Sequence, residues 1–252
     1  MFSNSIAPKD LVKRFIWNTC GPSLQHKLRC VHTVRQIKKN RYFREPEMDL
    51  IRRFVKSGDR VADLGANVGV YTREFSLAAG SEGRVYAFEP VVENYDILTT
   101  LVRKLRLDNV TTFRAAIGSQ TAESEMVIPE MKDFRGFYWA HLAGSEDPGR
   151  REKVSIFALD DLFKLKVIED INFIKCDVEG SELEVLEGSV DLVNGCRPTW
   201  LMEVSRKTSF AVFSLFNQLG YDAFVYSTDL VPVKGYRDGE FSNYLFRHRN
   251  EK

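Results

Sequence analysis

The strongest constraint on the fold is an alternation of two periods along the chain. From Lys56 onward, short apolar runs with the strand period of two alternate with longer runs whose apolar residues recur at the helical period of 3.6. The first of these runs are a strand over 60–66, a helix over 69–80, a strand over 84–90 and a helix over 92–107. Strands that alternate with helices build parallel sheets covered by helices on both faces. The chain is therefore predicted to be an α/β protein.

The second half of the chain continues this order and then changes it. Further strands are expected over 110–118, 171–180 and 198–205. Two β-rich runs near the end, 220–227 and 241–248, are separated only by a loop and are expected to pair antiparallel at one edge. Residues 129–152 are predicted to be an irregular insert. The expected architecture is a mostly parallel seven-stranded sheet with an antiparallel C-terminal hairpin, in the order of the Rossmann-like fold of class I methyltransferases. Such folds bind ligands at the carboxyl ends of the strands.

Charge divides the chain into two parts. Residues 1–47 hold ten Lys or Arg and three acids, a net charge of +7, whereas the whole chain carries only +1, so the remainder carries −6. We therefore predict a basic, helical N-terminal extension over 1–47 and a main domain over 48–252. The extension is interpreted as a solvated helical collar, a lid over an anionic substrate, a membrane-surface contact or a contact between two copies of the chain.

Several classes of protein are excluded by composition. With 44% hydrophobic and 28% charged residues, the chain lies in the globular range. It has no run of 18 apolar residues, and its N-terminus does not have the pattern of a signal peptide. The four cysteines form no CxxC pair, which is typical of reduced thiols. We expect no transmembrane segment and a cytoplasmic protein.

The loop after the first strand, 63–69, has the sequence DLGANVG and predicts a cofactor site. Gly65 permits a tight turn, and Gly69 lets the next helix begin close to the sheet and to a ligand. Asp63 argues against the pyrophosphate of NAD, because a carboxylate repels it, but it suits the ammonium group of S-adenosylmethionine. Glu89 ends the second strand, 24 residues after Gly65, where an acid can accept both ribose hydroxyls.

A second group of charged residues lies on the strand over 171–180. Lys175, Asp177 and Glu179 alternate and are expected on one face, and Glu203 ends the next strand in the same way. Two carboxylates at neighbouring strand ends can take a proton from a hydroxyl or bind a divalent cation; the metal reading is not favoured. An alternative interpretation is that Lys175 has a structural role and forms an ion pair with a carboxylate such as Asp63 or Asp160.

The insert supplies candidates for contact with the acceptor. Tyr138 and His141 lie there with Phe137 and Trp139, and loops above a rigid sheet often carry specificity. A locally packed aromatic cluster is the alternative.

At these residues the sequence resembles the FkbM family of S-adenosylmethionine-dependent methyltransferases. The resemblance extends from about Glu47 to Phe246 and rests on the motifs VADLGANVGVYT (61–72), YAFEP (86–90), FRAAIGS (113–119), LDDL (159–162), FIKCDVEGSELEVLEG (173–188) and NYLF (243–246), with Glu203. It implies O-methylation of a hydroxyl on a sugar or natural product. The residues that it implies for the cofactor are Asp63, Gly65, Asn67 and Gly69 for the methionine part, Glu89 with Pro90 for the ribose, and Ala115 and Ala116 for the adenine. It places Asp177, Glu179 and Glu203 near the methyl-transfer point.

Our hypothesis is thus a methyltransferase acting on a small-molecule hydroxyl acceptor that contains carbohydrate, with no nucleic-acid partner favoured. The rivals are a NAD-dependent dehydrogenase and a non-catalytic nucleic-acid or membrane-surface protein on the same fold, which would use the +7 segment. The extension is also a candidate surface for homo-oligomer formation.

Overall fold

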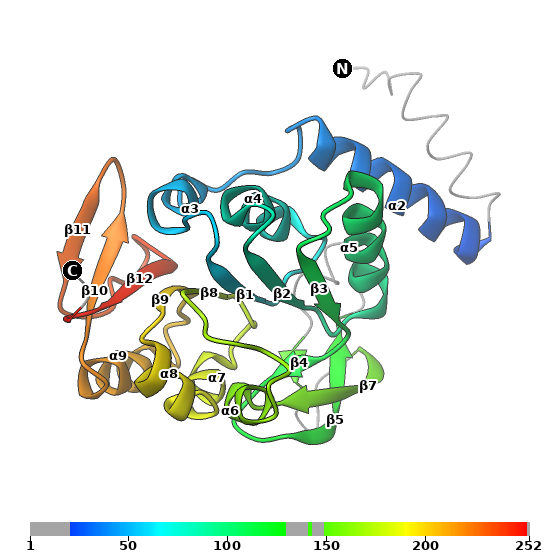
Figure 1. The fold of residues 1–252 in the computed structure, drawn as a ribbon. Coiled ribbons are helices and arrows are strands. Elements are labelled where there is room, and N and C mark those ends of the chain that lie inside the picture. The colour runs from blue at the N-terminus through cyan, green and yellow to red at the C-terminus, as the bar shows by residue number, and fades with distance from the viewer. Residues whose placement is uncertain (1–20, 130–140, 143–148, 251–252) are drawn as a thin grey trace, which may run out of the picture. The chain divides into compact units, whose positions relative to one another are not determined.

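The computed structural model describes residues 21–129, 141–142 and 149–250 (Figure 1). The chain divides into two compact units, 1–42 and 43–252. Within the first unit, the described helix is α2 (Pro22–Lys38). The domain boundary near residue 48 and the helical extension over 1–47 stay predictions. No helix in the described ranges is long and apolar enough to span a membrane.

The second unit is built on an eight-stranded sheet with the order β11-β10-β12-β9-β8-β1-β2-β3. Its strands are β1 (Arg60–Leu64), β2 (Arg84–Phe88), β3 (Val110–Phe113), β8 (Phe173–Cys176), β9 (Thr199–Glu203), β10 (Tyr221–Tyr226), β11 (Leu230–Val233) and β12 (Asn243–His248). Strands β3, β2, β1, β8 and β9 are parallel neighbours, and β12 and β11 run antiparallel to the strands beside them. The α/β prediction is confirmed.

Helices cover both faces of this sheet, as Figure 1 shows. On one face lie α3 (Met48–Phe54), α4 (Val70–Ala79) and α5 (Val92–Leu105); on the other lie α6 (Leu159–Lys164), α7 (Glu182–Glu187), α8 (Val190–Cys196) and α9 (Ser209–Gln218). Because both faces are covered, the central strands are buried almost throughout: all four residues of β8 and four of the five in β1. The two largest of the described hydrophobic clusters lie on the two sides of the sheet.

The sequence-based strand count was one too low. The four residues of β11 carry Pro232, which cannot donate a ladder hydrogen bond but is tolerated on an edge strand. Strands β10 and β12 pair antiparallel as predicted, but β12 lies between β9 and β10, so the predicted hairpin is not itself the edge.

A second sheet was not predicted. It has the order β4-β7-β5-β6 and consists of β4 (Ala116–Ile117), β5 (Ala122–Ile128), β6 (His141–Leu142) and β7 (Arg150–Phe157). The expected strand over 110–118 is therefore divided between the two sheets as β3 and β4. The insert expected over 129–152 ends earlier than predicted, because β7 begins at Arg150 and pairs with β5 along its length.

Candidate functional site

The chemically distinctive side chains gather where four parallel strands end. Strands β2, β1, β8 and β9 are consecutive neighbours, so their carboxyl ends form one edge. Glu89 follows β2, the DLGANVG loop follows β1, Asp177 follows β8, and Glu203 ends β9. The register pairs Asp63 with both Ala87 and Lys175. The sheet thus brings together residues 140 positions apart in the sequence, from Asp63 to Glu203.

The loop after β1 is folded tightly against its neighbours. The amides of Gly65 and Ala66 both donate to the carbonyl oxygen of Phe88, at 3.0 and 2.9 Å. Gly65 has a φ of +76°, and a Cβ there would lie 1.8 Å from the carbonyl oxygen of Asp177. The close approach predicted for Gly65 is therefore made by the backbone after β8. At Gly69, with a φ of +87°, a Cβ would lie 2.8 Å from side-chain methyls of Leu98 and Leu101, so this glycine lets α4 pack on α5.

Glu89 is buried and connects the β1 loop to the turn after β2. Its Oε2 accepts a 2.8 Å hydrogen bond from the amide of Asn67, and its Oε1 accepts a 2.9 Å bond from the amide of Val91. Burial raises the pKa of Glu89 to about 7, against the lowering effect of these bonds. The side chain of Asn94 donates a third hydrogen bond to this carboxylate, so one of its four lone pairs is left for a ligand.

Asp63 lies deeper than the rest of the loop. Its carboxylate accepts a 2.5 Å hydrogen bond from the hydroxyl of Thr72 in α4, and only 1% of the residue is exposed. Burial raises the pKa of Asp63 to about 6, and Thr72 and the nearby Lys175 act in the opposite direction. The structure therefore places Asp63 beneath the loop, where it supports the start of α4.

Lys175 is a fully buried cation with several acidic residues nearby. Its Nζ donates to Oδ2 of Asp177 at 3.1 Å and lies 5.1 Å from the centre of the Tyr71 ring. Burial alone would lower the pKa of Lys175, but Asp177, Glu45 and Glu203 outweigh it and raise the pKa. The structural interpretation of Lys175 expected an ion pair with a carboxylate such as Asp63 or Asp160. The ion pair is made with Asp177, and Asp63 is near enough for the charge of Lys175 to act on its pKa. Asp160, one of those named, instead accepts hydrogen bonds from the amides of Asp191 and Leu192 at the start of α8.

Asp177 and Glu203 are joined by a side-chain hydrogen bond. Burial would raise the pKa of Asp177, but the Lys175 ammonium and the bond to Glu203 outweigh it and lower the pKa. Burial together with the charge of Asp177 raises the pKa of Glu203 to about 8. Near neutral pH the two carboxyl groups therefore hold one proton between them. Glu203 carries this proton and donates it in the hydrogen bond to Asp177.

Three residues that sequence reasoning missed complete this group. Tyr71 in α4 donates a 2.6 Å hydrogen bond to Oε2 of Glu45, and burial is the main cause that raises the pKa of Tyr71. Burial also raises the pKa of Glu47. Glu45 and Glu47 precede α3 and had been assigned to the N-terminal extension. The one available signal was that they are the first acids after residues 11–44, which contain none.

Asn243, at the start of β12, faces the same group. Its Cα is the register partner of Glu203, so the two side chains lie on the same face of the sheet. Asn243 is 7% exposed, and its Oδ1 has no hydrogen-bond partner in the structure. The Oδ1 of Asn67 in the β1 loop is likewise buried without a partner. Unpaired buried amide oxygens are costly, by about 1–3 kcal/mol, unless a ligand supplies the donor.

The remaining predicted residues lie near the same edge or outside the described ranges. Glu179 is exposed in the turn after β8 and has a φ of +50°. Glu182 stabilises this turn, because it accepts hydrogen bonds from the amide of Gly180 and the hydroxyl of Thr208. Pro90 and Ala116 are half-buried and Ala115 is buried. Tyr138 lies outside the described residues, and of His141 only the backbone is described, paired with Val127. No cluster suited to a metal ion occurs among the residues described.

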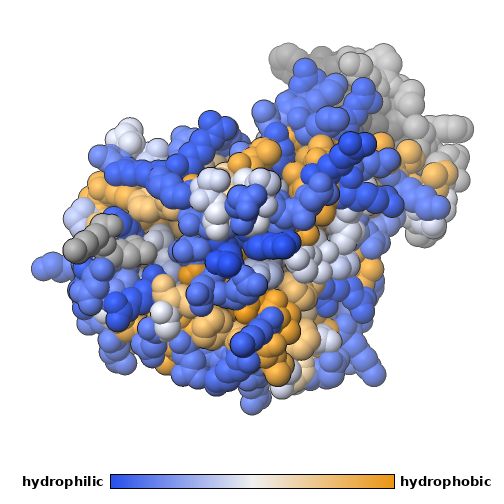
Figure 2. Space-filling view, in the orientation of Figure 1, coloured by the Kyte–Doolittle hydropathy of each residue, from blue (hydrophilic) through white to orange (hydrophobic). Residues whose placement is uncertain are grey.

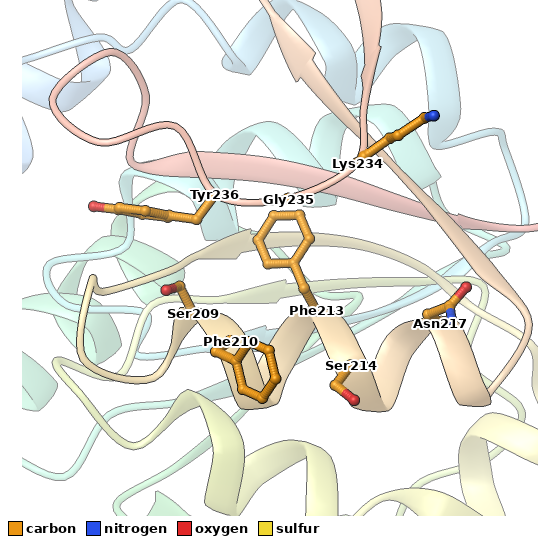
Figure 3. Close-up of a pocket in the computed structure, with 8 residues that line it drawn as sticks. All are labelled: Ser209, Phe210, Phe213, Ser214, Asn217, Lys234, Gly235 and Tyr236. Atoms are coloured by element: carbon orange, nitrogen blue, oxygen red, sulfur yellow. The ribbon is translucent and has the colours of Figure 1, made fainter.

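A pocket of about 430 Å³ lies elsewhere, between α9 and residues 234–236 (Figure 3). It is lined by Ser209, Phe210, Phe213, Ser214, Asn217, Lys234, Gly235 and Tyr236. None of these residues belongs to the strand-end group, so this pocket does not enter the chemistry below.

Comparisons with known proteins agree with this geometry. The sequence model of the methyltransferase FkbM domain matches residues 63–223, more than half of the chain. Among solved structures, a methyltransferase FkbM from Methylobacillus flagellatus KT has a TM-score of 0.51 at 18% identity, over 76% of this chain and 44% of that one. The present chain thus spans less than half of that protein, and the likeness shows the fold alone.

Two further structures resemble the chain more weakly. A SAM-dependent O-methyltransferase from Thermotoga maritima has a TM-score of 0.47 at 14% identity, over 87% of this chain and 72% of that one. A precorrin-6y C5,15-methyltransferase from Geobacter metallireducens GS-15 has a TM-score of 0.46 at 13% identity, over 81% and 88%. A search of curated proteins gave no match.

Proposed function

The chain belongs to the FkbM methyltransferase family, and from this premise we propose that it transfers a methyl group from S-adenosylmethionine to a hydroxyl of a sugar or glycosylated natural product. This proposal rests on the observation that two groups of residues, one for the cofactor and one for the acceptor, lie at the same edge of the sheet. The glycine loop and Glu89 would hold an adenosine cofactor. Asp177 follows β8, two strands from β2, and Glu203 ends β9, three strands from β2, where an acceptor would enter.

The residues of the cofactor side fit S-adenosylmethionine. Glu89 keeps a free lone pair for a ribose hydroxyl, and the unpaired Oδ1 of Asn67 can accept a bond from the ammonium group. No part of the β1 loop has the GxGxxG pattern that a dinucleotide pyrophosphate requires. When bound, S-adenosylmethionine supplies an electrophilic methyl group; the chain itself has to orient the acceptor and remove its proton.

The Asp177–Glu203 pair would remove that proton. A free alcohol is a weak nucleophile, and a positioned base typically contributes about 10²–10⁴-fold in rate. Once Glu203 has lost its proton, the pair can take the proton of the acceptor hydroxyl as its oxygen attacks. Lys175 keeps one carboxylate charged and in place through its 3.1 Å bond to Asp177. Alignment of the acceptor at this point supplies a further part of the acceleration.

The surroundings of this pair favour a neutral acceptor with a second hydrogen-bond donor. Glu45, Glu47, Asp177 and Glu203 disfavour an anionic group beside the reacting oxygen. The unpaired Oδ1 of Asn243 can accept a hydrogen bond from a donor next to the reacting hydroxyl. Neighbouring hydroxyls are the ordinary chemistry of sugars, which supports a carbohydrate acceptor.

A reducing compartment such as the cytoplasm suits this enzyme. The described cysteines Cys30, Cys176 and Cys196 are all free thiols, and two of them are buried.

The test is methyl transfer from S-adenosylmethionine labelled in its methyl group to a panel of methyl glycosides and their deoxy analogues. We expect label in glycosides with neighbouring hydroxyls and at least about tenfold less in the analogue that lacks the second hydroxyl, because Asn243 is then left unpaired. Label confined to amine or carboxylate acceptors would contradict O-methylation. Equal labelling of each glycoside and its deoxy analogue would contradict the role of Asn243.

A further inference from the structure

The basic segment before the catalytic unit has no part in the chemistry proposed above. Residues 11–44 contain nine Lys or Arg and no Asp or Glu. Helix α2 lies within this segment and is itself free of acids. An unbroken positive segment attracts anionic surfaces of several kinds, so charge alone does not identify the partner.

The exposed side of α2 combines this charge with large apolar side chains. Leu24, Leu28 and Val31 follow one another at steps of four and three residues, so they form one stripe along the helix, and they are 47%, 43% and 64% exposed. Lys27 and Lys38 are exposed on the same side. The adjoining side of the helix is different, since Cys30, Val34 and Ile37 are buried there. Figure 2 shows hydrophilic and hydrophobic residues side by side over the face of the molecule that it draws.

We propose that the exposed side of α2 binds in the plane of an anionic lipid bilayer. A helix at a bilayer interface buries its apolar stripe among the acyl chains, while its lysines and arginines contact anionic headgroups. Nucleic acid would use the cations through its phosphates but would leave three exposed aliphatic side chains without a role. The charge and the apolar stripe together therefore match a bilayer better than an RNA. The association is peripheral, because α2 does not have the length or apolarity of a membrane span.

The experiment is co-sedimentation of the full chain with vesicles, without cofactor or acceptor. Vesicles of phosphatidylcholine with phosphatidylglycerol are compared with vesicles of phosphatidylcholine alone, at low and high salt. Lys27→Glu with Lys38→Glu reverses two charges on α2. Lys104→Glu with Lys166→Glu, two exposed lysines of the second unit, changes the net charge by the same amount and serves as control. Leu28→Ser with Val31→Ser removes most of the apolar stripe and leaves the charge unchanged.

We expect binding to the anionic vesicles only, weakened by salt. The Lys27/Lys38 variant should bind at least about tenfold more weakly, since two cations that attract anionic headgroups become two anions that the headgroups repel. The Leu28/Val31 variant should also bind several-fold more weakly, and the Lys104/Lys166 control should match the wild type. Circular dichroism confirms that each variant is folded.

Three results would overturn the proposal. The first is no binding of the wild type to anionic vesicles. The second is loss of vesicle binding in the Lys104/Lys166 control to the same degree as in the α2 variant. The third is binding, to vesicles or to a single-stranded RNA, that is as strong in the Leu28/Val31 variant as in the wild type. Such binding would show that the surface recognises charge alone. A dimer that is lost in the Leu28/Val31 variant, with no vesicle binding, would assign the stripe to a second copy of the chain.

Discussion

The position of a single proton determines what the Asp177–Glu203 pair can do. Glu203 is the member with the raised pKa, about 8, because it is buried next to the charged Asp177. Asp177 stays ionised because Lys175 holds it. A protonated carboxyl cannot accept the proton of an alcohol. Below this pKa Glu203 is protonated, and the ionised Asp177 is engaged by Lys175 and by the hydrogen bond with Glu203, so Glu203 is not available as the base. The chemical step should therefore depend on the ionisation of Glu203.

This reasoning predicts the pH dependence of kcat. In the wild type, kcat should rise with pH through about 8, since Glu203 has to lose its proton. Glu203→Gln should remove this rise and lower kcat by at least about 10²-fold, the usual contribution of a general base. Glu187→Gln, at an exposed position in α7, is the matched control and should keep the wild-type profile. A rise at the same pH in Glu203→Gln would assign the proton to another group.

Sequence reasoning reached only part of this group of residues. Lys175, Asp177 and Glu203 were identified because charged residues are unexpected on strands covered on both faces. Glu45, Tyr71 and Asn243 were not singled out as site residues, because they come from a segment before α3, from a helix and from an antiparallel strand. No spacing in the sequence shows that these segments meet. Their contribution depends on the order of strands, which the sequence pattern leaves open.

At the scale of elements, the loop between β1 and α4 is fixed by contact with the loop after β8. Gly65→Ala would place a methyl group 1.8 Å from the carbonyl oxygen of Asp177, which requires the backbone to move. We expect a loss of more than about 2 kcal/mol in the free energy of unfolding, measured with urea. Cofactor affinity should fall with it, because the same loop carries the amide of Asn67 that binds Glu89.

Gly239 supplies the matched control for this prediction. Its φ of +73° is close to that of Gly65, but a Cβ there would meet nothing within 4 Å. Gly239→Ala therefore measures the backbone cost alone, about 1 kcal/mol. If the two variants lost the same stability, the contact with Asp177 would contribute nothing.

The elements that the sequence failed to predict are short or shared between sheets. The run over 110–118 looks like one strand because its apolar pattern is continuous, yet it leaves the main sheet after Phe113 and enters the second sheet at Ala116. β11 has only four residues and includes a proline, so it has no clear strand pattern. The strands β1, β2, β8 and β9 and the helices α4 and α5, in contrast, were predicted correctly because each buries apolar side chains.

At the scale of the whole molecule, the fold explains why the candidate site residues lie at one edge of the sheet. Parallel strands joined by helices present all their carboxyl ends on the same side, so residues from distant parts of the chain meet there. The family and the α/β class were predicted from the sequence, and both are confirmed. The reaction, the acceptor and the roles of individual residues stay proposals that rest on this edge.

The central claim is that the edge binds an adenosine cofactor through Glu89, and calorimetric titration with S-adenosylhomocysteine tests it directly. The wild type should bind, with an affinity that falls as the pH is lowered through about 7, because the carboxylate of Glu89 accepts ribose hydrogen bonds best when ionised. Glu89→Gln should bind at least about tenfold more weakly, the effect of losing a hydrogen bond to a charged group, and should lose this pH dependence. Unchanged affinity in Glu89→Gln, or binding of NAD in place of S-adenosylhomocysteine, would contradict the account.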